Sequence, residues 1–196
     1  MDQHADHATI VTRAVVTGWK PEDLERKNEL EARFLNLGYQ HGPLLEQIVL
    51  EELKAEGIEP VHRAESYNTL VDVGRALWCD LLIGAGGQAF TNAVSALGVG
   101  DSNAAYAAGQ TNLQGAVVTT DRIRKAMDVS FPSRAANVIT WRATFATTEA
   151  NFTWNEWAIF NNVADGAGTM LNRAVANLGT KTNAVSWQLT VTTTLT

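Results

Sequence analysis

This sequence of 196 residues has a single cysteine, no long apolar run and no excess of positive charge. Cys79 has no second cysteine to pair with, which excludes a disulfide within the chain. No stretch of about 18 apolar residues occurs, so we expect no membrane span, and the polar start (residues 1–10) is not expected to be a secretory signal. The formal charge of -6 argues against binding to a nucleic-acid backbone, which requires a clustered positive face.

The charge is distributed unevenly along the chain. Residues 1–80 carry 8 lysines and arginines against 15 acidic residues, whereas residues 81–196 carry 7 against 6. Overall, 45% of the residues are hydrophobic, which suits a packed core. The chain therefore joins a charged, acidic part to a nearly uncharged part that is rich in Ala, Thr, Asn and Gly.

The acidic part is predicted to be mainly helical. Residues 9–17 are β-branched and favour a short strand or arm that needs a partner sheet. Helices are predicted over residues 21–37 and 43–56, because each segment begins with proline, carries apolar residues at helical spacing and ends at a glycine. Residues 58–66 are predicted to be an extended linker, and residues 67–83 a third helix.

The first two helices carry apolar stripes that two short helices cannot bury alone. We expect the stripes to dock into a groove of a different protein. The side chains expected to bind this partner are Leu24, Leu30, Phe34, Leu44, Leu45, Ile48 and Leu53. Residues 1–66 are accordingly predicted to form an extended and helical attachment arm, separate from a domain of residues 67–196 that contains a helix and a β-sandwich.

In the second half of the chain the apolar period changes to two, which indicates β-strands. Residues 125–131, 137–146 and 185–195 alternate in this way, which predicts one buried face and one wet face. Turn signals separate the strands, among them Gly98 to Asp101. The predicted fold class is α+β, with an N-terminal helical arm of two to three helices followed by an antiparallel β-sandwich.

The sequence offers no catalytic or metal-binding constellation. His4 and His7 are too few for a metal site, which needs three or four fixed ligands. His41 and His62 are expected to be solvated loop residues. Cys79 falls on the apolar side of a predicted helix, where a buried and inert thiol is expected. We therefore predict no catalytic residue, no metal and no cofactor, in a protein that is not an enzyme.

A cluster of aromatic residues leaves two interpretations open. Exposed tryptophans on a sandwich commonly stack on sugar rings, but aromatic side chains also dominate the cores of proteins. The candidates for such a glycan platform are Trp154, Trp157 and Trp187. Within the same cluster, Glu156 is expected either to pair with Arg142 or Arg173 or to face the solvent.

Several motifs in the second part of the chain follow one another in a recognisable order. They are Ala96-Leu-Gly-Val-Gly-Asp101, Asn112-Leu-Gln-Gly115, Trp154-Asn-Glu-Trp-Ala-Ile-Phe-Asn161, Gly168-Thr-Met-Leu-Asn-Arg173 and Leu178-Gly-Thr-Lys181, followed by an alternating Thr-rich strand. Together they resemble a group of tailed-bacteriophage virion proteins of the tail-fibre and minor structural type. The resemblance covers about residues 67–196, leaves residues 1–66 without a match, and implies a structural, non-enzymatic protein.

The resemblance implies a component of a tail, baseplate or fibre that is part of the virion and is assembled in the host cytoplasm. We expect the arm to attach it to other virion proteins, and the sandwich to pack as a homo-oligomer, with a trimer favoured. The alternatives are a receptor- or glycan-binding module at a fibre tip, which would contact a host-surface glycan, and a capsid decoration protein. Neither nucleic acid nor a membrane is expected as a partner.

Overall fold

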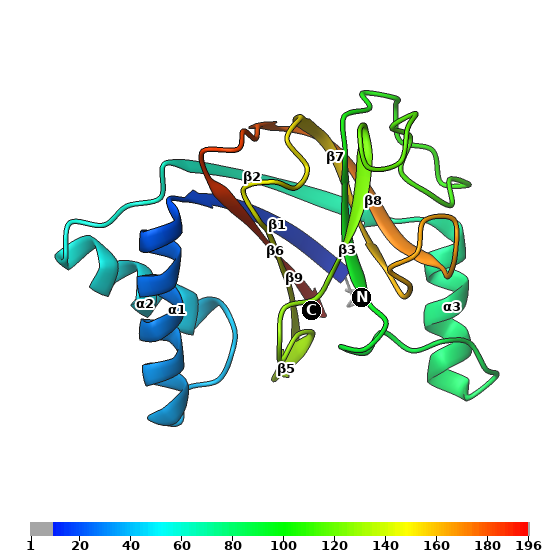
Figure 1. The fold of residues 1–196 in the computed structure, drawn as a ribbon. Helices are drawn as coiled ribbons and strands as arrows, with labels where there is room; N and C mark the ends of the chain where they lie inside the picture. Colours follow the sequence, from blue (N-terminus) through cyan, green and yellow to red (C-terminus); the bar gives the residue numbers. More distant parts are fainter. Residues whose placement is uncertain (1–9, 196) are drawn as a thin grey trace, which may run out of the picture.

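The computed structural model describes residues 10–195, and these form an α+β fold, as the sequence predicts (Figure 1). The helices are α1 (Pro21–Asn36), α2 (Pro43–Ala55) and α3 (Asp72–Ile83). The strands are β1 (Ile10–Trp19), β2 (His62–Leu70), β3 (Ala96–Gly100), β4 (Arg122–Ala126), β5 (Ser133–Ala135), β6 (Val138–Phe145), β7 (Thr153–Phe160), β8 (Met170–Thr180) and β9 (Ser186–Leu195). They make one antiparallel sheet in the order β4-β3-β7-β8-β2-β1-β9-β6-β5.

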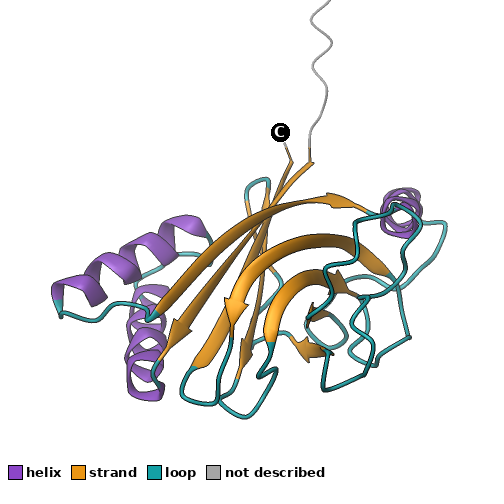
Figure 2. Cartoon of the chain, turned by 90° about the horizontal axis from the view of Figure 1, so that it is seen from above, coloured by secondary structure: helices purple, strands orange, loops and turns teal. Residues whose placement is uncertain are grey.

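The sheet curls into a half-barrel whose concave side encloses the main apolar core (Figure 2). β2 is the corner of the curl, because residues 62–68 pair with β1 whereas Thr69 and Leu70 pair with β8. Since this strand joins both halves, the predicted sandwich of two stacked sheets is not confirmed. Large buried side chains of the core include Leu97, Val99, Trp141, Phe145, Trp154, Trp157, Ile159, Trp187, Leu189 and Val191.

Asp128, in the loop that follows β4, forms hydrogen bonds to the part of strand β6 that extends beyond its pairing with β5. The backbone N–H of Asp128 donates to the carbonyl oxygen of Arg142 at 2.8 Å. In return, the Asp128 carboxylate accepts hydrogen bonds from the backbone N–H of Thr144 at 2.9 Å and from its hydroxyl at 2.8 Å. The edge of β6 beyond its short pairing with β5 is thereby partly satisfied, which limits the open backbone at this end of the sheet.

β1 lies in the centre of the sheet, between β2 and β9 (Figure 1). It pairs with β9 along residues 10–19, and its side chains Ala14 and Val16 are fully buried in the main core. The N-terminal segment is therefore built into the sheet, and the separate helical arm is not confirmed. The predicted boundary between residues 66 and 67 falls inside β2.

Helices α1 and α2 form a hairpin with a small apolar core of its own. Its central residue is Trp19 at the end of β1, which is fully buried against Leu30 and Leu45. The hairpin covers the face of β1, β6 and β9 that points away from the main core. For this reason the polar face of β9, which the alternation predicts to be wet, is mostly buried, and Gln188 is only 2% exposed.

β3 is a fully buried strand at a position where the sequence predicts a turn. It pairs with β4 on one side and with β7 on the other. A side chain at Gly98 would collide with Phe160, and one at Gly100 would collide with Glu156. These glycines therefore serve close packing within a strand, a role that a local sequence pattern does not distinguish from turn formation.

Two other predicted elements differ from the structure. Residues 62–70, expected to be linker and helix start, form β2, and the third helix begins only at Asp72. The strand predicted over residues 125–131 ends at Ala126. Val129 then lies 86% exposed, because the chain turns sharply before Pro132. The strands predicted over residues 137–146 and 185–195 are confirmed as β6 and β9.

Candidate functional site

An apolar groove of about 410 Å³ lies at the mouth of the half-barrel, between α3 and the strands β5, β6 and β8. A volume of this order is usual for sites that bind a ligand or the side chains of a partner. Inside it, Phe90 contacts Trp141 edge to face, with the ring centroids 5.6 Å apart. The apolar residues that line the groove are Trp78, Leu81, Leu82, Phe90, Ile139, Trp141 and Leu171.

Two polar side chains of β5 line one edge of this groove. Arg134 is exposed, and its Nη1 donates to the carbonyl oxygen of Ala136 at 2.7 Å. Among residues 10–195 no carboxylate lies within ion-pair distance of it. Ser133 Oγ is buried and has no hydrogen-bond partner in the part of the chain that the structure describes. The groove therefore joins an apolar surface to one positive charge that has no counterion among the described residues.

The opposite side of α3 is a second exposed surface. Successive residues of a helix are about 100° apart, so Cys79 and Ile83 point away from the groove-lining residues Trp78 and Leu81. Ile83 is 79% exposed, and Cys79 and Asp80 are exposed beside it. Cys79 is thus not the buried thiol that the sequence predicts. α3 lies at the edge of the molecule (Figure 2).

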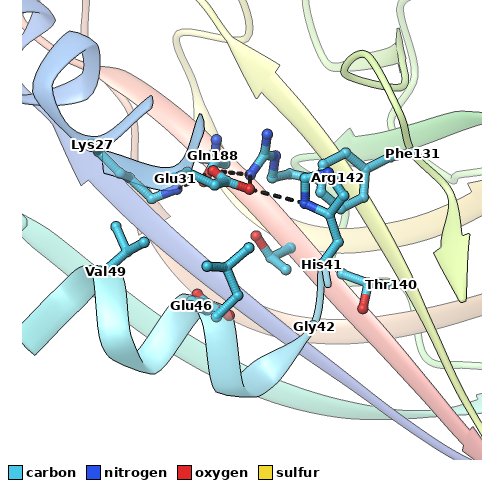
Figure 3. A pocket seen from close by; sticks show the side chains of 12 residues that line it. Lys27, Glu31, His41, Gly42, Glu46, Val49, Phe131, Thr140, Arg142 and Gln188 are labelled. Carbon is cyan, nitrogen blue, oxygen red and sulfur yellow. Dashed lines mark hydrogen bonds and ion pairs between the residues drawn. The ribbon is translucent and has the colours of Figure 1, made fainter. Parts of the chain in front are cut away.

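A cluster of charged side chains is buried between the hairpin and the sheet (Figure 3). Glu31 of α1 is its centre, because both its carboxylate oxygens lie 2.5 Å from Arg142 Nη1 on β6. Glu31 Oε1 also lies 3.2 Å from His41 Nδ1, and Glu31 Oε2 lies 3.5 Å from Lys27 Nζ. Arg142 Nε donates in turn to Asp128 Oδ2 at 3.0 Å. Five residues from four segments of the chain therefore form one hairpin charge cluster.

Burial and neighbouring charges act against each other in the hairpin charge cluster. Burial would raise the pKa of Glu31, but the positive charges of Lys27 and Arg142 outweigh this effect and hold the pKa below its ordinary value. Burial lowers the pKa of Lys27 and also that of His41. His41 is therefore neutral at pH 7, and Glu31 is ionised.

This arrangement acts as an electrostatic clamp of the hairpin on the sheet. The Glu31 carboxylate is surrounded by three nitrogen-bearing side chains, and the space beside it is about 20 Å³, which holds roughly one water molecule. On the other side of the cluster, an open hollow of about 520 Å³ is lined in part by Glu31, His41 and Arg142. His41, expected to be a solvated loop residue, belongs to the clamp. It also packs against Phe131, with the two ring centroids 4.5 Å apart.

The structure decides the partner of Glu156. Arg173 Nε donates to Glu156 Oε2 at 2.6 Å, and both side chains are fully buried. Glu156 also accepts the backbone N–H groups of Gln114 and Gly115 at 2.8 Å each, while Arg173 Nη2 donates to the carbonyl oxygen of Ala104 at 2.9 Å. The ion pair thus holds the long loop between β3 and β4 against the outer side of β7 and β8.

The three tryptophans of the predicted glycan platform are core residues. Trp154 and Trp157 are 0% exposed and Trp187 is 2% exposed. A bulge between Trp154 and Glu156 shifts the alternation of β7, so that both of its tryptophans point to the main core. Trp187 stacks on His62, a second histidine expected to be solvated, with ring centroids 4.3 Å apart. A sugar ring therefore finds no exposed face on these residues.

The side chains expected to bind a partner through the arm are used mainly inside the hairpin. Four of them are buried there and two are half-buried, in each case against Trp19 or against one another. Leu44, which is 65% exposed, is the exception. The buried ones are Leu30, Phe34, Leu45 and Leu53, and the half-buried ones are Leu24 and Ile48. The two helices therefore bury their stripes against each other and the end of β1.

A buried lysine was not marked by any sequence signal. Lys181 is 1% exposed, and its Nζ donates to the carbonyl oxygen of Ala146 at 2.7 Å and to Asn151 Oδ1 at 2.9 Å. Burial lowers its pKa to about 8. Ala146 and Asn151 lie at the two ends of the turn between β6 and β7. The amine binds both residues and so stabilises the conformation of this turn.

Within residues 10–195, no group of three or more His, Cys, Asp or Glu side chains is arranged to hold a metal ion. In the same range, no helix has the length and apolar character needed to cross a membrane. His4 and His7 lie outside the residues that the structure describes.

The surfaces that stand out among residues 10–195 are thus the exposed outer face of α3 and an apolar groove whose arginine has no ion-pair partner in that range. Comparisons with known protein families, with curated protein sequences and with solved structures gave no match for this chain.

Proposed function

We propose that this protein is a non-enzymatic structural subunit of a tailed-bacteriophage virion, which packs against other protein chains. The observation that carries the proposal is the exposed apolar surface at the end of α3, where Leu82 is 74% and Ile83 is 79% exposed beside the groove. Contiguous apolar surface of this kind is rare on proteins that act alone and marks sites of interaction. The motif resemblance supplies the setting in the virion.

The motifs that carry the resemblance have roles in the architecture, which supports a structural function. The segments Trp154–Asn161 and Gly168–Arg173 lie mainly in the neighbouring strands β7 and β8. Their polar side chains are engaged inside the fold: Glu156 binds Arg173, and Asn172 Oδ1 accepts the backbone N–H of Ile159 at 2.9 Å. Each of these three polar side chains is at most 1% exposed. The motifs therefore specify a rigid framework.

The place of attachment that we propose is a different one from the arm expected from the sequence. The apolar stripes of the hairpin pack against each other and against Trp19, so most of their surface is not accessible to a partner. The groove between α3 and β5 takes over the role of candidate contact surface, because its apolar side chains and Arg134 are open to a partner.

The proposal is tested in phage particles that carry the gene of this protein. Quantitative mass spectrometry of purified particles should find the chain at several copies per particle. Particles produced without the gene should regain the protein when it is supplied in trans. Ile83→Glu should reduce this incorporation strongly, because it places a charge on the exposed apolar end of α3.

Leu44→Glu is the matched control, since Leu44 is also exposed but lies on the hairpin. It should leave incorporation unchanged. The proposal is wrong if infected cells contain the chain but purified particles do not. Loss of incorporation with Leu44→Glu and not with Ile83→Glu would instead assign the attachment to the hairpin.

A further inference from the structure

The two exposed surfaces around α3 match each other in chemistry. The groove is apolar and carries a single cation, Arg134, without a counterion within the described chain. The outer face of α3 is apolar at Cys79 and Ile83 and carries a carboxylate, Asp80, which likewise has no ion-pair partner among residues 10–195. One surface thus has the shape of a recess and the other that of a convex helix, with opposite charges.

These surfaces cannot satisfy each other within one molecule. Trp78 and Leu81 direct one side of α3 into the groove, whereas Cys79 and Ile83 project from the other side of the same helix. The outer face of a given α3 is therefore accessible only to another molecule. The other charged pair on this helix, Asp72 with Arg75, is an internal ion pair, so Asp80 is the carboxylate that is left for a partner.

We infer that copies of this chain associate head to tail, with the outer face of α3 of one copy seated in the groove of the next. The contact places Ile83 of one copy among the apolar groove residues and brings Asp80 towards Arg134 of the neighbour. It is a helix-in-groove contact, in which apolar anchors supply affinity and the charges fix the orientation. The inference rests on the proposed function, because it specifies how the structural subunit packs.

The geometry of the contact decides the type of assembly. A contact between two different surfaces is heterologous, and such contacts close into a ring or continue as a filament. Each copy offers one groove and one outer face, so every copy in the assembly makes the same two contacts. A ring of three, which the resemblance implies, is one closed solution of this kind.

The experiment uses the full chain and two variants with complementary defects. Ile83→Glu disables the outer face and leaves the groove intact, and Arg134→Glu disables the groove and leaves the outer face intact. Both positions are exposed, so circular dichroism and thermal unfolding should match those of the wild type. Multi-angle light scattering over a concentration series measures the mass of each species. Leu44→Glu serves again as a surface control that should assemble like the wild type.

We expect the wild type to form assemblies of at least three chains, and each variant alone to associate roughly tenfold or more weakly. An equimolar mixture of the two variants should form pairs of twice the 21.2 kDa chain mass and stop there. The reason is that the remaining groove binds the remaining outer face, while the second contact opposes two glutamates. In one chain, the double exchange Asp80→Arg with Arg134→Asp should restore assembly that either single exchange weakens.

Three results would overturn the inference: a wild type that stays monomeric, variants that assemble as the wild type does, or a mixture that contains monomers only. A wild type that is monomeric in solution but present in particles would refute the head-to-tail contact and leave the structural role standing. Assembly in solution together with absence from particles would refute the structural role and leave the head-to-tail contact standing.

Discussion

Arg173 and Glu156 form an ion pair of 2.6 Å between neighbouring strands, and neither side chain has contact with solvent. The two charges satisfy each other, and both side chains also form hydrogen bonds to backbone and side-chain groups of the loop between β3 and β4. Charges that are removed from water in this way need each other, because an unpaired buried charge is far less stable than a pair. This relationship defines the first test.

Arg173→Met should lower the free energy of unfolding by about 3–5 kcal/mol, because it leaves Glu156 buried without a counterion. Urea denaturation measures the change. The control is Arg13→Met, since Arg13 pairs with Glu65 on the surface and both side chains are 36% exposed. The control should cost less than about 1 kcal/mol. Equal losses of unfolding free energy in the two variants would show that the buried ion pair contributes no more to stability than the exposed one.

Glu31→Gln should loosen the hairpin from the sheet, because the substitution removes the charge that holds Lys27 and Arg142 together. We expect a loss of about 3 kcal/mol in the free energy of unfolding. Hydrogen exchange of backbone amides should speed up in α1 and α2 more than in β7 and β8. The matched control is Glu29→Gln on the same helix, whose side chain is 60% exposed. A uniform increase of exchange across the whole sheet would contradict the clamp.

The pKa of Lys181 predicts a rise of stability with pH. Its value is about 8 in the folded protein, against an ordinary value of 10.5, because burial disfavours the charged amine. Between these two pH values the unfolded chain binds more protons than the folded one, so the free energy of unfolding increases with pH, by at most about 1.4 kcal/mol per pH unit. The free energy of unfolding of the wild type, minus that of Lys181→Met, should therefore increase from pH 8 to pH 10. A constant difference over this range would refute the depressed pKa.

Gly100→Ala should destabilise the protein by roughly 1–3 kcal/mol, because the added methyl group meets the Glu156 carboxylate and strains the buried ion pair. Gly109→Ala is a suitable control: it lies in the loop between β3 and β4, and its added methyl group meets no atom within 4 Å. The control should be close to neutral, since it chiefly restricts the unfolded chain. Thermal unfolding of both variants gives the comparison. If both are neutral, the packing of Gly100 on Glu156 is not tight.

Elements with one buried face were predictable from the sequence, whereas elements specified by distant contacts were not. β6 and β9 alternate because one of their faces lines the core, and this pattern is local. β3 was missed because the residues that require Gly98 and Gly100 to be glycine, Phe160 and Glu156, lie more than fifty positions away. The local pattern of apolar residues indicates which positions are buried, but it does not indicate which distant side chains bury them.

The candidate site was predictable only in part, for the same reason. The apolar face of α3 is visible in the sequence, because Leu77, Trp78 and Leu81 recur at helical spacing. The groove arises only when this helix meets β5 and β6, which follow about fifty residues later. In the hairpin charge cluster, too, Glu31 and Arg142 are 111 positions apart. Neither site has a spacing that a sequence motif could express.

The place of the first strand beside the last has a consequence for synthesis on the ribosome. β1 ends at Trp19, but its partner β9 begins only at Ser186, so more than 160 residues between them must be made before the two strands can pair. Pairing over such a separation is slow, because a long loop must be ordered first. A translation product that stops before β9 leaves the facing edges of β1 and β6 open, so a chain truncated at this point yields no smaller competent subunit.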